Sequence, residues 1–510
     1  MLLGDLLKGI EVQDFAGDPG IEIAGLAYDS RKVKPGYLFV ALRGSTLDGH
    51  DFVEDAVRRG AMAIVTDRPC GTGQKPSHIQ VSDSREVLSK LAVRFYGEPF
   101  SKVNLIGITG TNGKTTTSYL LESILKASGG RPGVVGTINY RFGDKNWKAS
   151  VTTPESLDLM RALKEMADAG ATDVVIEVSS HALDQGRVRD CPFRVAVFTN
   201  LSRDHLDYHG SMDAYFEAKS RLFKGLDERR PDRAARAVIN ADDPRGEALI
   251  RMTDAHAVTY GLSRGAQVRA TQWEATRSGL SARVVSPVGE FELRSSLMGG
   301  VNIYNILAAV SAAICMDISP EHIVSGIAQL KHVPGRLEAV ENDQGLTIVV
   351  DYAHTPDALL KVFESLKPLV EGRLITVFGC GGDRDKGKRR EMGRIAAGLS
   401  DLVFITSDNP RTEDPSAIAS QIEQGVVEQG MKRLMGTNVE GMSSRGYVLE
   451  LDRKEAIFAA IRAAKQGDLV LIAGKGHEDY QIIGDRVRHF DDREVAREAL
   501  AYLCGMPEAM

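Results

Sequence analysis

The sequence lacks the features of a secreted, disulfide-stabilised or membrane-spanning protein. Its five cysteines include no CxxC pair and are odd in number, which argues against a disulfide framework or a structural zinc site. No run of about eighteen apolar residues is present to span a bilayer. Residues 1–15 lack the basic start and apolar core of a signal peptide. We therefore expect a cytoplasmic protein that does not bind a membrane.

An excess of basic residues is also missing. Lysine and arginine number 63 against 69 acidic residues, so the formal net charge is -6. Proteins that bind nucleic acid generally present a basic surface, so this balance argues against a nucleic-acid partner. The hydrophobic share of 43% and the charged share of 26% are ordinary for a globular protein. A chain of 510 residues has room for about three domains.

The order of apolar and amphipathic segments predicts three domains of the α/β class, at residues 1–100, 101–334 and 335–510. In the first, apolar strands at 36–42 and 61–66 flank a helix that ends at Gly60. The second begins with a continuous apolar strand, a glycine-rich turn and a long helix from about Lys114 to Ser128. Continuous apolar strands between helices indicate a parallel sheet covered on both faces.

Later segments complete this expected fold. The β-rich pattern at 266–298 predicts an antiparallel insert, and the pattern at 301–316 predicts a buried helix. After Pro334-Gly335 four apolar strands recur, each followed by a helical segment, which predicts a second doubly wound, Rossmann-like domain. Residues 436–447 read as a loop insertion.

The strongest local signal is LIGITGTNGKTT at residues 105–116. A strand ends, glycines allow a tight turn and a helix begins, so backbone N–H groups would face a polyphosphate. Lys114 would reach the β- and γ-phosphates, and the Thr115 hydroxyl would bind Mg²⁺. The general P-loop pattern has a glycine at the position where this chain has Ile108. A P-loop predicts a nucleotide but does not separate kinases, GTPases and ligases.

Further motifs run through essentially the whole chain and decide among these classes. The sequence resembles the Mur ligase family, relatives of folylpolyglutamate synthetase. The motifs that carry this resemblance are GTNGKTT (110–116), TTPE (152–155), EVSSHAL (177–183), NLSRDHLDYHG (200–210), YFEAKSRLF (215–223), MGGVNIYNILAA (298–309), PGRLE (334–338) and DYAHTPDAL (351–359). The resemblance implies an ATP-dependent ligase that forms an amide bond through an acyl phosphate in peptidoglycan precursor synthesis.

The resemblance also implies an ATP and magnesium site. The ATP-binding residues would be Gly110, Thr111, Asn112, Gly113, Lys114, Thr115, Thr116, Asn302, Asn305, Arg336 and Asp351. Glu177, at the end of an apolar strand, would hold Mg²⁺ with Thr115. His205 would bind a second Mg²⁺, although its polar cluster alone also allows a capped turn or a solvated loop. Lys219, which without the family reads as a solvated helix lysine, would be carbamylated by CO₂ and organise the metal site.

Two substrate sites follow from the same resemblance. A UDP-muramoyl dipeptide would be held by Ser30, Ser45, Thr46, Leu47, Thr152, Thr153, Ser179, Gln185 and Arg187. The motif SDNPRTEDP (407–415) resembles the signature of diaminopimelate addition, and meso-diaminopimelate would be held by Arg384, Asp408, Asn409, Pro410, Arg411, Gly474 and Glu478. The Arg411 guanidinium can pair with the distal carboxylate of diaminopimelate, which lysine lacks. Glu478 can accept hydrogen bonds from the distal ammonium.

Three alternatives stay open at this stage. A lysine-adding ligase of the same family should lack the arginine of DNPR. A P-loop kinase or nucleotide switch would have no need of Glu478 or of the C-terminal domain. A non-catalytic nucleotide-binding module would not require Lys114, Glu177 or His205 to be intact. We expect a monomer that acts on small molecules.

Overall fold

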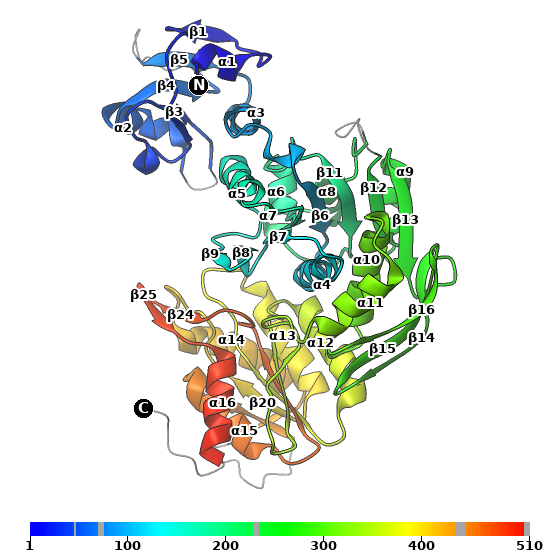
Figure 1. Cartoon of the computed structure of the whole chain (residues 1–510). Coiled ribbons are helices and arrows are strands. Elements are labelled where there is room, and N and C mark those ends of the chain that lie inside the picture. Colours follow the sequence, from blue (N-terminus) through cyan, green and yellow to red (C-terminus); the bar gives the residue numbers. More distant parts are fainter. Residues whose placement is uncertain (45–46, 70–75, 228–233, 435–444, 504–510) are drawn as a thin grey trace.

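The computed structural model describes residues 1–44, 47–69, 76–227, 234–434 and 445–503. Three regions follow one another along the chain, each built around its own sheet (Figure 1). The α/β class and the three-domain architecture are confirmed. The borders after residues 100 and 334 stay a prediction. No helix in the described residues is long and apolar enough to cross a membrane.

The N-terminal region has a sheet in the order β1-β5-β4-β3-β2, in which β1 runs antiparallel to β5 and the other pairs are parallel. Helix α3 starts at a capping residue, Asp83, whose carboxylate accepts the N–H groups of Arg85 and Glu86. Its apolar face packs against α5 of the central region, so one core continues between the two regions. The elements are α1 (Leu3–Leu7), β1 (Asp14–Ala16), β2 (Gly25–Ala27), η1 (Ser30–Lys32), β3 (Tyr37–Val40), α2 (Val53–Arg58), β4 (Ala61–Thr66), β5 (Ser77–Gln80) and α3 (Ser84–Phe95).

The central sheet has the order β16-β15-β14-β13-β12-β11-β6-β10-β7-β8-β9. Strands β6, β7 and β10–β14 pair in parallel, and the antiparallel insert predicted at 266–298 extends this same sheet. Helices α4, α10 and α11 cover one face, with α5, α6 and α8 on the other. The strands are β6 (Asn104–Thr109), β7 (Pro132–Val135), β8 (Asn139–Phe142), β9 (Lys145–Lys148), β10 (Asp173–Glu177), β11 (Phe193–Phe198), β12 (Arg236–Asn240), β13 (His256–Gly261), β14 (Val268–Thr276), β15 (Gly279–Ser286) and β16 (Gly289–Ser295).

The central helices include the two that carry predicted ATP-binding residues. Helix α4 follows the glycine-rich turn, and the strongly apolar α10 packs against it. These helices are α4 (Lys114–Ala127), α5 (Ser156–Asp168), α6 (Ser180–Asp184), α7 (Leu206–His209), α8 (Met212–Ser220), α9 (Gly246–Met252), α10 (Asn302–Cys315) and α11 (Pro320–Gln329).

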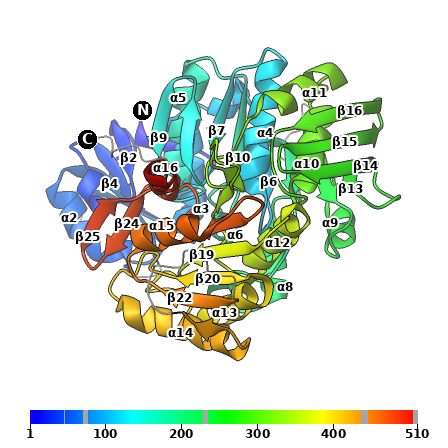
Figure 2. The same cartoon turned by 90° about the horizontal axis from the view of Figure 1, so that it is seen from below.

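The C-terminal sheet has the order β17-β18-β23-β19-β20-β22-β21, with parallel pairing except between β17 and β18. Helices α12, α13 and α14 pack on one face, and α15 and α16 pack on the other (Figure 2). The elements are β17 (Glu338–Ala339), β18 (Thr347–Asp351), α12 (Pro356–Leu366), β19 (Leu374–Phe378), α13 (Gly387–Leu399), β20 (Leu402–Ile405), α14 (Pro415–Glu428), β21 (Lys432–Arg433), β22 (Gly446–Leu449), α15 (Arg453–Ala463), β23 (Leu469–Ala473), β24 (Tyr480–Ile483), β25 (Arg486–His489) and α16 (Asp492–Leu503).

Two expectations for this region need correction. The predicted loop insertion at 436–447 overlaps β22, which begins at Gly446; residues 435–444 lie outside the described part. The last apolar strand, β23, leads first into the antiparallel hairpin β24–β25 and only then into α16. A strand as short as β22 and a polar hairpin carry too few apolar residues to stand out in sequence.

Candidate active site

The predicted phosphate loop lies between the end of β6 and the start of α4. Gly110 and Gly113 have φ values of 148° and 89°, a region that residues with a Cβ rarely adopt. A Cβ on Gly113 would lie 2.3 Å from Oδ1 of Asn305 on α10. The loop therefore packs closely against α10, and the start of α4 presents backbone N–H groups of the kind that bind an anion.

A cavity of about 1000 Å³ opens between the central and C-terminal regions. It is lined by the phosphate loop, the start of α10 and the segment that enters the C-terminal region. All predicted ATP residues except Gly110 line it: Thr111, Asn112, Gly113, Lys114, Thr115, Thr116, Asn302, Asn305, Arg336 and Asp351. The fold thus brings together residues that lie more than two hundred positions apart in the sequence.

Both predicted active-site lysines reach the phosphate loop. Nζ of Lys114 donates to the carbonyl oxygens of Gly110 and Thr111, each at 2.9 Å, and Nζ of Lys219 donates to Gly110 at 2.8 Å. Lys219 is buried, so it is not the solvated helix lysine that its local sequence alone would indicate. Burial, and then the Lys114 charge, hold the pKa of Lys219 well below its usual range. Burial also lowers the pKa of Lys114.

Glu177 lies beside the loop with its carboxylate buried. Oε2 accepts hydrogen bonds from the hydroxyls of Thr115 at 2.9 Å and Thr137 at 2.8 Å, and Oε1 accepts from the Thr137 N–H at 3.0 Å. Hydroxyl and carboxylate oxygens are the ligands that Mg²⁺ prefers, so this donor set fits the predicted ion. Across the described residues, no group of three or more His, Cys, Asp and Glu side chains could hold a metal by itself.

His205 directly precedes α7 and has a left-handed backbone, φ 53°. Its ring lies 4.8 Å from the ring of His181 and 3.5 Å from a carboxylate oxygen of Asp204, measured from Nε2. Burial lowers the pKa of His205 to about 4, so the imidazole is neutral near pH 7 and keeps a free lone pair. Both His205 and Asp204 line the large cavity.

The two regions also touch directly across the cavity. Nη2 of Arg336 donates to the Thr115 hydroxyl at 3.2 Å. On the other side, Asp357 accepts from the Ser202 hydroxyl at 2.5 Å and from Nδ2 of Asn112 at 3.4 Å. Asp357 stands in the motif DYAHTPDAL (351–359) but was not among the predicted site residues. Its signal was an acidic residue in the first turn of a helix at the seam.

The predicted dipeptide residues of the central region form one hydrogen-bonded group. The Thr153 hydroxyl donates to the backbone oxygen of Glu177 at 2.7 Å and accepts the N–H of Ser179 at 3.0 Å. Arg187 donates to the Thr153 carbonyl oxygen at 2.8 Å and to Oε1 of Gln185 at 2.7 Å. Thr152 joins the group through Thr137, which also bonds Glu177.

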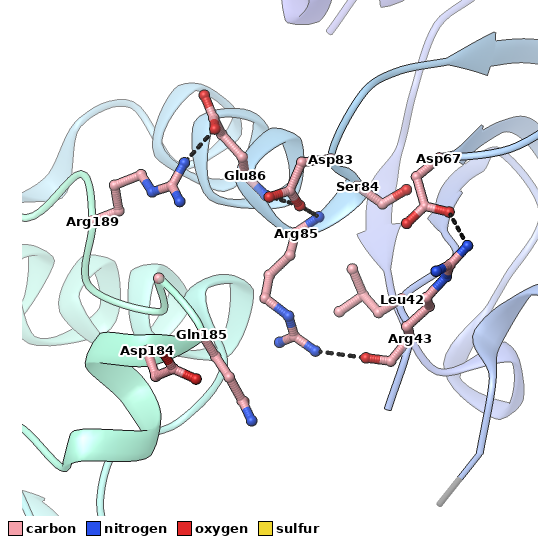
Figure 3. Close-up of a pocket in the computed structure, with 11 residues that line it drawn as sticks. Leu42, Arg43, Asp67, Asp83, Ser84, Arg85, Glu86, Asp184, Gln185 and Arg189 are labelled. Atoms are coloured by element: carbon pink, nitrogen blue, oxygen red, sulfur yellow. Dashed lines mark hydrogen bonds and ion pairs between the residues drawn. The ribbon is translucent and has the colours of Figure 1, made fainter. Parts of the chain in front are cut away.

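Beside this group lies a pocket of about 270 Å³ at the seam with the N-terminal region (Figure 3). Arg43, Arg85 and Arg189 contribute to its lining, and Gln185 reaches it from the central side. None of these three arginines was among the predicted site residues. Of the predicted N-terminal contacts, Ser30 is buried in η1 and Leu47 is exposed; neither lines this pocket. Ser45 and Thr46 lie outside the described residues.

The predicted amino-acid residues gather at the carboxyl ends of β19, β20 and β23. Nη1 of Arg411 donates to the carbonyl oxygen of Gly382 at 2.7 Å, near Arg384. Nδ2 of Asn409 donates to Oε2 of Glu478 at 2.8 Å. Arg411 has φ 52°, so its backbone is held in a conformation that is unfavourable for a residue with a side chain.

A buried lysine that sequence reasoning did not select completes this group. Nζ of Lys475 lies 3.1 Å from Glu478 and 3.8 Å from Asp408. Burial, and then the nearby Asp408 carboxylate, raise the pKa of Glu478. Gly474 donates its N–H to the backbone oxygen of Asp351 at 3.1 Å, which connects this group to the ATP cavity. Pro410 follows Asn409 in the same loop, as the motif required.

Comparison with known proteins assigns the family. Models of the Mur ligase middle domain, of the Mur ligase glutamate ligase domain and of the Mur ligase family catalytic domain match residues 108–313, 335–476 and 22–96. A UDP-N-acetylmuramoyl-L-alanyl-D-glutamate–2,6-diaminopimelate ligase from Geobacter metallireducens is 49% identical over 99% of both chains. The ligase of the same name from Geobacillus kaustophilus is 47% identical over 95% of this chain and 96% of its own.

Solved structures agree with this assignment. A structure of a UDP-N-acetylmuramoyl-L-alanyl-D-glutamate–2,6-diaminopimelate ligase is similar over 99% of both chains, with a TM-score of 0.69 and 33% identity. The MurF ligase of Thermotoga maritima in complex with ADP has a TM-score of 0.61 over 94% of this chain and 97% of its own; at 22% identity it supports the fold alone. The chain therefore belongs to the Mur ligase family.

Proposed function

We propose that this protein is an ATP-dependent ligase that adds meso-diaminopimelate to UDP-N-acetylmuramoyl-L-alanyl-D-glutamate. The observation that carries the proposal is the presence of Arg411 and Glu478 in one group at the carboxyl edge of the C-terminal sheet, where Asn409 of the Arg411 loop donates to Glu478. An arginine and a carboxylate in the same site match the distal carboxylate and ammonium of diaminopimelate. The relatives that share this chain's full length carry that activity in their names.

The first step joins two anions in the cavity between the regions. A carboxylate oxygen of the dipeptide attacks the γ-phosphorus of ATP, the bond to ADP breaks and an acyl phosphate forms. Lys114 and Arg336 supply positive charge here, and the start of α4 supplies N–H donors. One Mg²⁺ held by Thr115 and Glu177, and a second held by the neutral His205, would neutralise the phosphate charge when bound.

The second step uses the amine of the amino acid. It attacks the acyl carbon, the bond to the phosphate oxygen breaks, and inorganic phosphate leaves as the amine loses a proton. Water would compete by hydrolysing the acyl phosphate, so the cavity must close during turnover. Asp357 on the C-terminal side and Ser202 and Asn112 on the central side already meet at the seam, and they would hold the closed form.

Lys219 has the environment that carbamylation needs. The reaction requires a neutral amine, because its lone pair attacks the carbon of CO₂, and burial beside Lys114 lowers the pKa of Lys219. The product is an anion, which the neighbouring Lys114 would stabilise. We propose that this anion organises the magnesium site near Glu177.

The decisive experiment measures phosphate release with ATP, Mg²⁺ and the UDP-muramoyl dipeptide against a panel of amino acids. We expect meso-diaminopimelate to support turnover and L-lysine to support very little. Turnover with lysine would instead assign the lysine-adding ligase. Phosphate release without any amino acid acceptor would favour a different P-loop activity. The reaction is proposed to take place in the cytoplasm, with a monomer acting on small molecules alone.

A further inference from the structure

A fully buried ion pair lies beneath the predicted amino-acid loops. Arg453, the first residue of α15, and Asp492, the first residue of α16, have side chains that are both 0% exposed. Nε and Nη2 of Arg453 donate to the two carboxylate oxygens of Asp492, each at 2.7 Å. Burying two charges incurs a desolvation cost that packed apolar side chains would avoid. Overall stability alone therefore explains this pair poorly.

The guanidinium of Arg453 also reaches two separate loops. Nη2 donates to the carbonyl oxygen of Ala473 at 3.0 Å, and Nη1 donates to that of Ser407 at 3.4 Å. Ala473 ends β23 and directly precedes Gly474. Ser407 follows β20 and directly precedes Asp408. The two loops held in this way carry all the predicted amino-acid contacts except Arg384: Asp408, Asn409, Pro410, Arg411, Gly474 and Glu478.

The strands that lead into these two loops do not pair with each other. Strands β20 and β23 are not neighbours, because β19 lies between them. The loops also touch through Asn409 and Glu478 and through Lys475 and Asp408, and Arg411 donates its N–H to Ile482 of β24. The side chains of Asn409 and Glu478 are ones that the amino acid itself would engage. Arg453 instead donates to backbone oxygens of the two loops. These bonds can persist while a substrate replaces the bond between Asn409 and Glu478.

We propose that Arg453, fixed by Asp492, is a positioning residue for the amino-acid substrate. It sets the distance between the Arg411 loop and the Glu478 loop, so both ends of one diaminopimelate molecule find their partners together. The proposal rests on the proposed function of these loops. Displacements of about 1 Å in a binding group can change turnover about a hundred-fold. Loss of this brace, by which we mean the contacts of Arg453 with the two loops, should therefore be measurable.

The chain contains a matched control at the opposite edge of the same sheet. Arg373 and Asp468 precede β19 and β23, and they pair at 2.7 Å with side chains 20% and 5% exposed. Arg373 also donates to the carbonyl oxygen of Ala463. This pair joins the amino ends of the strands, far along the sheet from the loops that bind the amino acid.

The test compares two double variants of the full chain. Arg453→Met with Asp492→Leu removes both charges, so no buried charge is left alone; Arg373→Met with Asp468→Leu does the same at the other edge. KM for each substrate and kcat come from phosphate release, and melting temperatures come from circular dichroism. The first variant should raise KM for meso-diaminopimelate about ten-fold or more, with KM for ATP and the UDP-muramoyl dipeptide within about two-fold of wild type. The control should lower the melting temperature and leave all three KM values near wild type.

Several outcomes would overturn the proposed role of Arg453. An unchanged KM for meso-diaminopimelate in the first variant would do so, as would an equal rise in the control. If the first variant does not fold, Arg453→Lys provides the test, because lysine keeps the positive charge but cannot make the several hydrogen bonds of the guanidinium. A normal KM for meso-diaminopimelate in Arg453→Lys rejects the proposal. If the wild type prefers another amino acid, the proposed function fails, and the same comparison with that amino acid still tests the brace.

Discussion

Lys114 and Lys219 share one hydrogen-bond acceptor, the carbonyl oxygen of Gly110, at 2.9 and 2.8 Å. Two ammonium groups converging on one oxygen repel each other, and burial removes the water that would screen them. Burial lowers the pKa of both side chains, and the Lys114 charge lowers that of Lys219 further. Conversion of Lys219 to a carbamate would replace this repulsion by attraction. Lys114 would then be free to turn toward a phosphate.

Lys219→Ala should therefore lower kcat by about a hundred-fold or more, because the anion that organises the metal site is lost. Acetate or formate should restore part of the activity by occupying the place of the missing carbamate. Phosphate release with and without each anion measures this. The control is Lys224→Ala, which removes a half-exposed lysine paired with Glu217 and should be nearly as active as wild type. Full activity of Lys219→Ala would reject a catalytic role, and loss without rescue would reject the carbamate.

Gly113→Ala should weaken ATP binding. The new Cβ would lie 2.3 Å from Oδ1 of Asn305, and φ is 89°, so α10 or the loop must move. We expect KM for ATP to rise about ten-fold or more, with the fold retained. Gly129→Ala is the matched control, because its φ is 85° and nothing lies within 4 Å of the new Cβ. Equal effects of both substitutions would mean that backbone strain alone, and not the contact with α10, is responsible.

Arg411→Ala should raise KM for meso-diaminopimelate and leave KM for ATP and the UDP-muramoyl dipeptide near wild type. Loss of one partner of a buried charged pair costs about 2 to 5 kcal/mol, or roughly thirty-fold to several thousand-fold in affinity. L-Lysine should be a very poor substrate for both proteins. Arg390→Ala, which removes an exposed ion pair with Glu428, is the control and should change none of these constants. A uniform loss for all three substrates would make Arg411 a structural residue.

The stability of the protein should fall as the pH drops below about 6.5. Burial lowers the pKa of His477 to about 3, so the folded protein keeps this ring neutral while the unfolded chain protonates it near pH 6.5. Its contribution is present above the unfolded pKa and is lost progressively toward pH 3, by a few kcal/mol at most. Free energies of unfolding from urea titrations at pH 7, 5.5 and 4.5 measure the slope. His477→Gln should flatten it; an unchanged slope would contradict the assignment.

The sequence by itself determined the local elements and the chemistry of the loops. Continuous apolar strands and the turn before Lys114 predicted the parallel sheets and the phosphate loop, because period and glycine placement are local properties. The DNPR motif pointed to Arg411 through its resemblance to a family signature. Short-range patterns could not reveal β22, a strand of few residues, or the polar hairpin β24–β25.

Tertiary structure alone decided what each polar side chain meets. Lys219 lies on a short helix, and only the packing of α8 beneath the phosphate loop buries its amine against Gly110. Lys475, Asp357 and the pair Arg453–Asp492 stood in the sequence as ordinary charged residues. Their roles depend on contacts between segments far apart in the chain, and such contacts form only when the sheets are assembled. Burial, which fixes their hydrogen bonds, is a property of the folded molecule and not of its local sequence.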